Sequence, residues 1–230
     1  MNQLEPVSVI VIVKNGARFL GAALSSIQQQ TLPPLEILVV DGGSTDRTAE
    51  IARSFTGVRY LLQPHSGISN AYNYGIAQAQ GELLAFLSYD DLWTPDKLAV
   101  QAGYLAAHPE CQYTVCRIHY FCEPGDTPPS GFRPEWLAQE PVAYIMETLV
   151  ARRSLFARTG LHRTDLATGG DTDWFARVFD AREIGHACDQ VLLHKRVHRD
   201  NSSLVAPDSN DQLLKILRNS LRRKRAAGQR

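Results

Sequence analysis

Two adjacent carboxylates follow a short apolar stretch near the middle of the chain. Residues 83–87 are continuously apolar, which is typical of a strand buried on both faces of a mostly parallel sheet. Asp90 and Asp91 come shortly after this stretch. Ligands of open α/β sheets bind at the carboxyl ends of the strands, and hard divalent cations prefer oxygen ligands. The pair is therefore a candidate cation site beside a phosphate-bearing ligand, and the alternative is an Asp that only caps the following helix.

Alternating strands and helices surround this stretch in the first half of the chain. Apolar periodicity and turn residues predict strands over 7–13, 35–40, 58–62 and 83–90, and helices over 18–29, 44–53, 66–79 and 95–107. Strands joined by helical crossovers of this length are parallel, with right-handed connections. We therefore expect a doubly wound α/β half in which three turns, at 14–15, 41–43 and 88–91, line one edge of the sheet as a nucleotide site.

The second half of the chain is less regular. Its composition predicts strands over 112–122, 142–151 and 191–197, helices over 153–159, 171–179 and 211–225, and a loop followed by irregular structure over 123–141. The Pro-rich and Gly-rich stretch between the first two of these strands is the reason for expecting a loop there.

The composition indicates an ordinary globular protein. The 24 basic and 24 acidic residues balance, so no overall field indicates a nucleic-acid partner. The four cysteines lack metal-finger spacing, and the start of the chain lacks a signal-peptide pattern. No apolar stretch approaches the roughly 20 residues that span a bilayer. We therefore expect a reduced, cytoplasmic protein.

Several segments carry motifs in a fixed order. They are strand 7–13 with Asn15-Gly16, then Glu36-Ile-Leu-Val-Val-Asp-Gly-Gly-Ser-Thr-Asp46, His65-Ser-Gly-Ile-Ser-Asn-Ala-Tyr-Asn-Tyr-Gly75 and Phe86-Leu-Ser-Tyr-Asp-Asp91. Later, Gly170-Asp171 precedes Arg177, and residues 191–203 end in His-x-x-Asn-Ser. Over about residues 7–203, this ordered set resembles the family 2 glycosyltransferases of GT-A fold.

The resemblance implies a fold and a division of labour along the chain. The fold would be a GT-A, nucleotide-diphospho-sugar transferase-like domain, with a doubly wound mixed sheet flanked by helices. Residues 1–110 would form its nucleotide-sugar-binding half and residues 111–205 its acceptor-binding half. Residues 206–230 would form a basic C-terminal helix or tail.

The resemblance also implies a cation, Mn²⁺ or Mg²⁺, held by Asp90 and by His198. A divalent cation offsets the charge that a nucleoside diphosphate gains as it leaves, so the expected chemistry agrees. The family's first acid in this motif is replaced by Ser88. A hydroxyl hydrogen-bonds a ribose oxygen or a metal-bound water but adds no charge, so we expect weaker metal binding than is usual in the family.

Nucleotide contacts are implied for Asn15, Asp41, Ser88 and Tyr89. Asp41 stands at the family's base-selecting position, where a carboxylate accepts a hydrogen bond from an N–H such as that of uracil or thymine. We therefore expect a uridine donor, and the alternative is that Asp41 only shapes its turn. Asp46 is expected to cap a helix rather than to contact the ligand.

Asp171 is the expected general base, which takes the acceptor's proton in an inverting transfer. It aligns with the Asp of the family's Glu-Asp motif, whose Glu is Gly170 here. An N-cap role is the alternative for Asp171, and Asp173 is the second choice for the base. Thr148 and Trp174 are expected near the acceptor, with packing in the core as the alternative for Trp174.

These assignments predict a metal-dependent glycosyltransferase of polysaccharide or glycoconjugate biosynthesis. It would move a sugar from a nucleotide diphosphate donor, expected to be a UDP-sugar, to a hydroxyl acceptor with inversion. Glycan, lipid-linked and peptide acceptors remain open. A nucleotide-sugar-binding or regulatory protein with little turnover is the alternative, because Ser88 and Gly170 both depart from the family's acids. A sugar nucleotidyltransferase is disfavoured, because the turn at 14–18 lacks a Gly-rich triphosphate cradle.

The C-terminal tail has leucines at near-helical spacing and a basic end at 221–230. One interpretation is peripheral contact with the inner face of the membrane, where a lipid-linked acceptor would lie. A solvated or oligomer-forming helix is the other.

Overall fold

The computed structural model describes residues 4–166, 168–199, 201 and 209–228. Its strands are β1 (Val7–Val13), β2 (Glu36–Asp41), β3 (Val58–Leu62), β4 (Leu83–Ser88), β5 (Leu92–Trp93), β6 (Tyr113–Phe121), β7 (Val150–Arg152) and β8 (Gly185–Arg196). Its α-helices are α1 (Leu20–Gln28), α2 (Thr48–Ser54), α3 (Ile68–Gln78), α4 (Lys97–Ala107), α5 (Arg153–Thr159), α6 (Gly170–Asp180) and α8 (Ser209–Gly228). Two short 3-10 helices are η1 (Pro134–Ala138) and η2 (Met146–Thr148).

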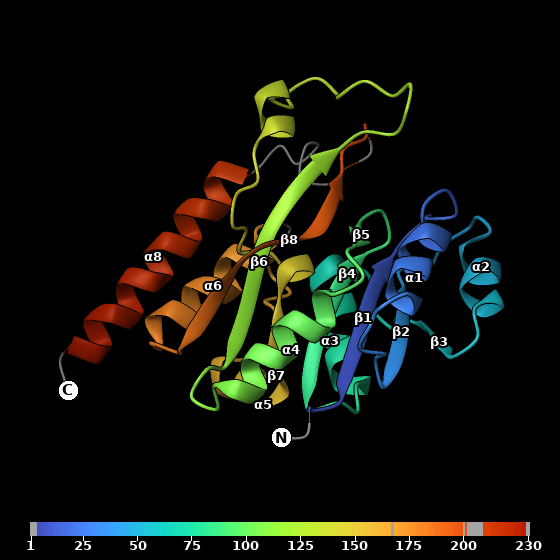
Figure 1. Cartoon of the computed structure of the whole chain (residues 1–230). Coiled ribbons are helices and arrows are strands. Elements are labelled where there is room, and N and C mark those ends of the chain that lie inside the picture. Colours follow the sequence, from blue (N-terminus) through green and yellow to red (C-terminus); the bar gives the residue numbers. More distant parts are fainter. Residues whose placement is uncertain (1–3, 167, 200, 202–208, 229–230) are drawn as a thin grey trace.

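The strands of the described chain form one mixed sheet in the order β3-β2-β1-β4-β7-β6-β8-β5. The first four strands in this order are parallel, and β7 joins β4 to β6 with antiparallel pairing on both sides. β8 is parallel to β6 and antiparallel to β5. Figure 1 shows the blue N-terminal strands in one half of the sheet and the long green β6 in the other, with α8 lying along α6. Because Ile12 pairs with Ser88 and Val13 with Asp41, the carboxyl ends of β1, β2 and β4 share one edge.

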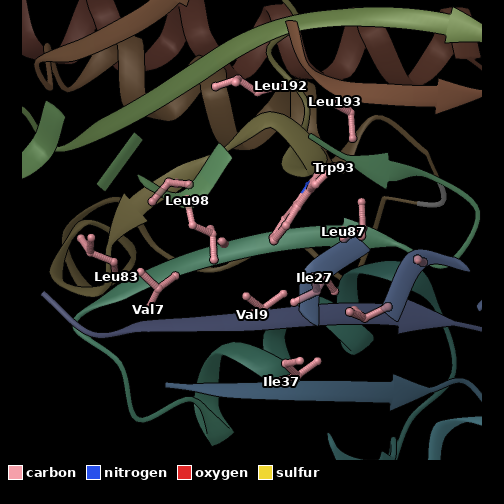
Figure 2. Packing of buried hydrophobic residues seen from close by; sticks show 14 of the residues in the cluster. Val7, Val9, Ile27, Ile37, Leu83, Leu87, Trp93, Leu98, Leu192 and Leu193 are labelled. Atoms are coloured by element: carbon pink, nitrogen blue, oxygen red, sulfur yellow. The ribbon is translucent and has the colours of Figure 1, made fainter. Parts of the chain in front are cut away.

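Helices cover both faces of the parallel strands. The side chains of β1 alternate, so its valines face the cluster that includes α1 while Ile10 and Ile12 face the cluster that includes α3. In Figure 2, Val7 and Val9 lie in the first cluster with Ile27 of α1. All of β1 is buried, as expected for a strand covered on both faces. Each fully buried aliphatic side chain of this kind contributes about 1.5–3 kcal/mol to folding.

Helix α3 approaches the sheet closely at Gly75. A Cβ atom at this position would lie 2.5 Å from Cγ2 of Ile10 and 3.3 Å from Cγ2 of Val40. A residue without a side chain is therefore needed for this contact. The close packing fixes α3 against the sheet, and the first turn of α3 reaches the shared edge of β1, β2 and β4.

Three expectations for the second half need correction. The predicted strand 142–151 is wrong over most of its length, because only Val150–Arg152 is a strand and Met146–Thr148 forms η2. Its apolar residues pack into the core through turns, in which the Leu149 amide donates to the Met146 carbonyl. β8 starts at Gly185, earlier than expected, because residues 185–188 pair with β6 ahead of a register shift. The irregular stretch 132–141 contains η1.

No helix in the described part of the chain is long and apolar enough to cross a membrane.

Candidate active site

Two cavities meet at the carboxyl end of β4. The first, of about 460 Å³, is lined by Asn15, Gly42, Gln63 and Tyr89 among others. The second, of about 530 Å³, is lined by residues that include Glu147, His162, Asp171 and Lys195. Ile12, Ile68, Ser88 and Asp90 line both cavities. The structure therefore brings the expected nucleotide-binding residues Asn15 and Tyr89 to the first cavity and the expected base to the second, with Ser88 and Asp90 between them.

Asp90 lies beside His198, as the sequence predicts. The Oδ2 atom of Asp90 is 3.0 Å from Nε2 of His198 and accepts a hydrogen bond of 3.3 Å from the Asn201 side chain. Asn201 in turn accepts from the His198 amide, so the end of β8 holds the imidazole in place. Only 8% of Asp90 and 5% of His198 is exposed.

Asp90 and His198 are the two metal donors that the family resemblance implies, and they lie side by side. Among the residues that the structure describes, no group of three or more His, Cys, Asp and Glu side chains is placed so that it could bind a metal ion. A hard cation that is bound by one or two protein ligands and completed by phosphate oxygens needs no larger group. The donor set therefore fits a cation that arrives with a diphosphate.

Asp91 differs from Asp90 in its contacts. It is fully buried, accepts 2.9 Å hydrogen bonds from Nζ of Lys195 and from the Arg196 amide, and lines neither cavity. Burial raises the pKa of Asp91 to about 7, although Lys195 opposes the shift. Burial would lower the pKa of Lys195, but its acidic neighbours Asp91, Glu147 and Asp90 outweigh burial and raise it. Asp91 thus ties the end of β4 to β8, while Asp90 faces the cavities.

Glu147 and Lys195 are site residues that sequence reasoning missed. The hydroxyl of Ser88 donates to Oε1 of Glu147 at 2.8 Å, and Nζ of Lys195 lies 3.8 Å from the same oxygen. The available signal was weak: Glu147 is a single charged residue in a mainly apolar stretch, and Lys195 is one of several basic residues near the end of its strand. Their side chains meet because η2 packs against both β4 and β8.

Asp171 lies in the first turn of α6 without capping it. Gly169 is the N-cap residue, and no side chain makes a capping hydrogen bond there. Instead, Oδ2 of Asp171 accepts a hydrogen bond of 3.1 Å from the Met146 amide. Burial and the nearby charge of Glu147 raise the pKa of Asp171 to about 7. A carboxylate with this pKa in a cavity is suited to accept a proton near neutral pH.

The alternative base is already engaged. Asp173 has no exposed surface and forms a 2.9 Å ion pair with Nε of Arg177. It does not line either cavity. The geometry therefore favours Asp171 over Asp173.

The turn that follows β2 uses Asp41 internally. Its Oδ1 atom accepts hydrogen bonds from the amide and the hydroxyl of Ser44 at 2.8 and 2.6 Å, and Oδ2 accepts from Tyr60 at 2.7 Å. Asp41 is fully buried and does not line the first cavity, unlike its neighbour Gly42. Burial and the bond to Asp41 raise the pKa of Tyr60 to about 12. Asp41 therefore does shape the turn after β2, and its selection of the nucleotide base stays a prediction.

Polar groups beside Asp41 fix the rest of this turn. Oδ1 of Asn15 accepts from the Thr45 amide at 2.9 Å. Asp46 accepts from the amides of Thr48 and Ala17, both at 3.0 Å, so it serves the first turn of α2 and also ties that helix to the end of β1. Gln63 lines the first cavity, and its buried Oε1 has no hydrogen-bond partner among the described residues.

Neither of the two residues expected near the acceptor lines a cavity. Thr148 is fully buried, and its hydroxyl donates to the Ala143 and Ile145 carbonyls. Trp174 is also fully buried and stacks on Phe156 with ring centroids 4.7 Å apart. Their contact with the acceptor stays a prediction without geometric support.

His162 is another residue that the sequence did not single out. It lines the second cavity and stacks on Tyr72 with ring centroids 5.1 Å apart. Both ring nitrogens are buried and lack hydrogen-bond partners within the described ranges. Burial and the charge of Arg177 lower the pKa of His162 to about 3, so the ring is neutral. Such a ring is ready to hydrogen-bond a polar occupant of the cavity.

Comparison with solved structures defines the class of fold. The chain is similar to TarS 1-349 of S. aureus in complex with UDP-GlcNAc, with a TM-score of 0.77 and 18% identity over 95% of this chain and 66% of that chain. It is also similar to the mannosyltransferase PcManGT of Pyrobaculum calidifontis in complex with GDP-Man and Mn²⁺, with a TM-score of 0.73 and 21% identity over 96% of this chain and 65% of that chain. The fold is therefore that of the GT-A glycosyltransferases, as the sequence predicts.

The family follows from the sequence comparison. The chain belongs to glycosyl transferase family 2, whose model matches residues 8–166. It is 28% identical to an uncharacterized glycosyltransferase of Rickettsia conorii over 90% of this chain and 36% of the relative. The chain thus spans about a third of the length of that relative.

Proposed function

We propose that the chain transfers a sugar from a nucleotide diphosphate donor to a hydroxyl acceptor. The observation that carries this proposal is that Asp90 lines two adjoining cavities, one of which also contains a carboxylate with a raised pKa, Asp171. A donor nucleotide in the first cavity would place its diphosphate near Asp90 and its sugar toward the second cavity. Asp171 would accept the proton of the acceptor hydroxyl as that oxygen attacks the anomeric carbon.

Asp90 and His198 would hold Mn²⁺ or Mg²⁺ together with the diphosphate oxygens. Such a cation supplies positive charge that offsets the charge developing on the departing diphosphate. The PcManGT complex contains Mn²⁺, which supports a cation for this fold. Ser88 brings no charge, so we expect the metal to bind weakly until the nucleotide is present.

We propose a uridine donor on the basis of Asp41, and we propose Gln63 as a second residue that contacts the base. The solved relatives hold UDP-GlcNAc in one case and GDP-Man in the other, so both bases belong in the test. Gln63 lines the first cavity, and its buried Oε1 is an unpartnered acceptor that a base N–H would satisfy on reaching it.

We propose inversion because a single in-line attack, assisted by Asp171, needs no second carboxylate as a nucleophile. The unpartnered nitrogens of His162 in the second cavity support a hydroxyl-rich occupant, either the sugar of the donor or the acceptor. Glycan, lipid-linked and peptide acceptors all present such hydroxyl groups.

Calorimetry with UDP, GDP, UDP-GlcNAc and GDP-Man tests the donor site, in Mn²⁺, in Mg²⁺ and in chelator. We expect binding that requires metal and falls at least tenfold in Asp90→Ala, because the variant loses the carboxylate ligand. Asp189→Ala is the matched control, since Asp189 is an exposed acid away from both cavities. Absence of nucleotide binding to the wild-type protein under every condition would refute the proposal. Donor binding without transfer to any hydroxyl acceptor would support the alternative, a nucleotide-sugar-binding protein.

Peripheral membrane contact through α8 is a separate proposal about the acceptor. The helix packs on α6 through buried Ile216, while Leu213, Leu214, Leu217 and Leu221 are 45–55% exposed. Basic residues near its C-terminal end would favour an anionic surface. Cosedimentation with vesicles of 30% phosphatidylserine tests this, and equal binding to neutral vesicles or none to either would exclude it.

A further inference from the structure

The direction of one hydrogen bond decides what Ser88 offers to a ligand. Ser88 Oγ lies 2.8 Å from Oε1 of Glu147, and an ionised carboxylate only accepts hydrogen bonds. The single hydroxyl hydrogen of Ser88 therefore points toward Glu147. Only the lone pairs of the Ser88 oxygen are left for the two cavities that this residue lines.

Glu147 is held firmly enough to impose this direction. It is 7% exposed and belongs to η2, whose backbone is anchored from the core. The Trp93 indole donates to the Glu147 carbonyl at 3.3 Å, and Lys97 donates to the Thr148 carbonyl at 3.1 Å. Nζ of Lys195 lies 3.8 Å from Oε1 of Glu147, so a positive charge stands beside this carboxylate.

We propose that Glu147 is a positioning residue that turns Ser88 into an acceptor and places a negative charge behind it. The pair thereby does what a carboxylate at position 88 would do, with the charge supplied by a residue 59 positions away in the chain. The ligand group is a hydroxyl that donates to Ser88, from either the ribose or the sugar of a nucleotide-sugar donor. This inference rests on the proposed function.

A purely structural role for Glu147 would leave a different signature. A tie between η2 and β4 would contribute to stability alone, and an acid placed at position 88 would not replace it. If Glu147 instead acts on the ligand through Ser88, which we call the relay, a carboxylate should support ligand binding from position 147 or from position 88. Two carboxylates together would repel each other, so an acid at position 88 succeeds only when Glu147 is neutral.

The experiment measures calorimetric affinity for UDP and GDP, their 2′,3′-dideoxy forms, UDP-GlcNAc and GDP-Man. The variants are Ser88→Ala, Glu147→Gln, Ser88→Asp and the double variant Ser88→Asp/Glu147→Gln, and the exposed Glu135→Gln is the control. We expect Ser88→Ala and Glu147→Gln each to weaken binding about tenfold, the size of one charge-assisted hydrogen bond. Ser88→Asp should bind as weakly, and the double variant should recover to within about threefold of wild type.

The ligand panel identifies the hydroxyl that Ser88 receives. If the ribose donates, dideoxy nucleotides bind wild type weakly and Ser88→Ala no longer distinguishes them. If the sugar donates, only the affinities for UDP-GlcNAc and GDP-Man fall in Ser88→Ala. Both patterns support the relay.

Two results would overturn it. One is wild-type affinity in Glu147→Gln, and the other is a double variant no better than its two parents. Should Glu147→Gln fail to fold, unchanged affinity of Ser88→Ala for the whole panel would overturn it equally. If the wild-type protein binds no nucleotide at all, the proposed function itself fails, which is a distinct outcome.

Discussion

Replacing Asp171 by Asn should abolish transfer and stabilise the protein at the same time. The carboxyl is buried beside Glu147, and its pKa is raised from its ordinary 3.8 to about 7. Its folded-state pKa exceeds its unfolded value, so stability is lost as the pH rises from about 4 to about 7. A rise of this size corresponds to a few kcal/mol of lost stability above pH 7 and to a smaller loss at pH 5. Asn removes this cost and keeps an oxygen for the Met146 amide.

Urea unfolding of wild type and Asp171→Asn at pH 5 and pH 8 measures the effect. We expect the variant to be more stable at both values, with a clearly larger gain at pH 8 than at pH 5. Its transfer rate should fall by about 10²–10⁴, the usual contribution of a general base.

The matched control is Asp173→Asn in the same turn of α6. Asp173 is more deeply buried than Asp171 and is paired with Arg177, so removing its charge should destabilise the protein at both pH values, by about 3 kcal/mol or more. An equal change in stability for Asp171→Asn at pH 5 and pH 8 would refute the reasoning, because it would show that the buried carboxyl does not titrate abnormally.

Three further outcomes are expected. The transfer rate of wild type should fall as the pH drops below about 7, because Asp171 becomes protonated. Glu147→Gln should move this fall in rate to lower pH, because the variant removes a like charge near Asp171. A pH–rate profile that is the same in the variant and the wild type would contradict this coupling. His162→Phe should keep the stacked ring and leave nucleotide affinity unchanged. Steady-state kinetics should show a severalfold higher KM for the sugar donor or for the acceptor, because the variant lacks the ring nitrogens. Unchanged KM for both substrates would show that the ring nitrogens bind neither. Gly75→Ala should cost about 1–3 kcal/mol in urea unfolding, because its Cβ would lie 2.5 Å from Ile10, and a neutral result would mean that α3 shifts freely.

Local patterns in the sequence determined most of the parallel half of the fold. Continuous apolar runs predicted β1 and β4, and both strands are buried along nearly their whole length. The family resemblance implied that Asp90 and His198 lie near each other, and Oδ2 of Asp90 is 3.0 Å from Nε2 of His198. The same reasoning failed for 142–151, where an apolar run fills the core through turns, since apolar composition reports burial more reliably than backbone pairing.

Only the tertiary structure decided how the acids divide their tasks. Asp90 faces the cavities while Asp91 is tied to Lys195, although the two are adjacent and chemically identical in the sequence. The contact of Ser88 with Glu147 depends on how η2 packs beside β4, which no local pattern encodes. Pairings between distant elements, and the burial that shifts their pKa values, arise from packing of the whole chain. The sequence therefore carries the residue types for the chemistry, and the fold determines which of them meet.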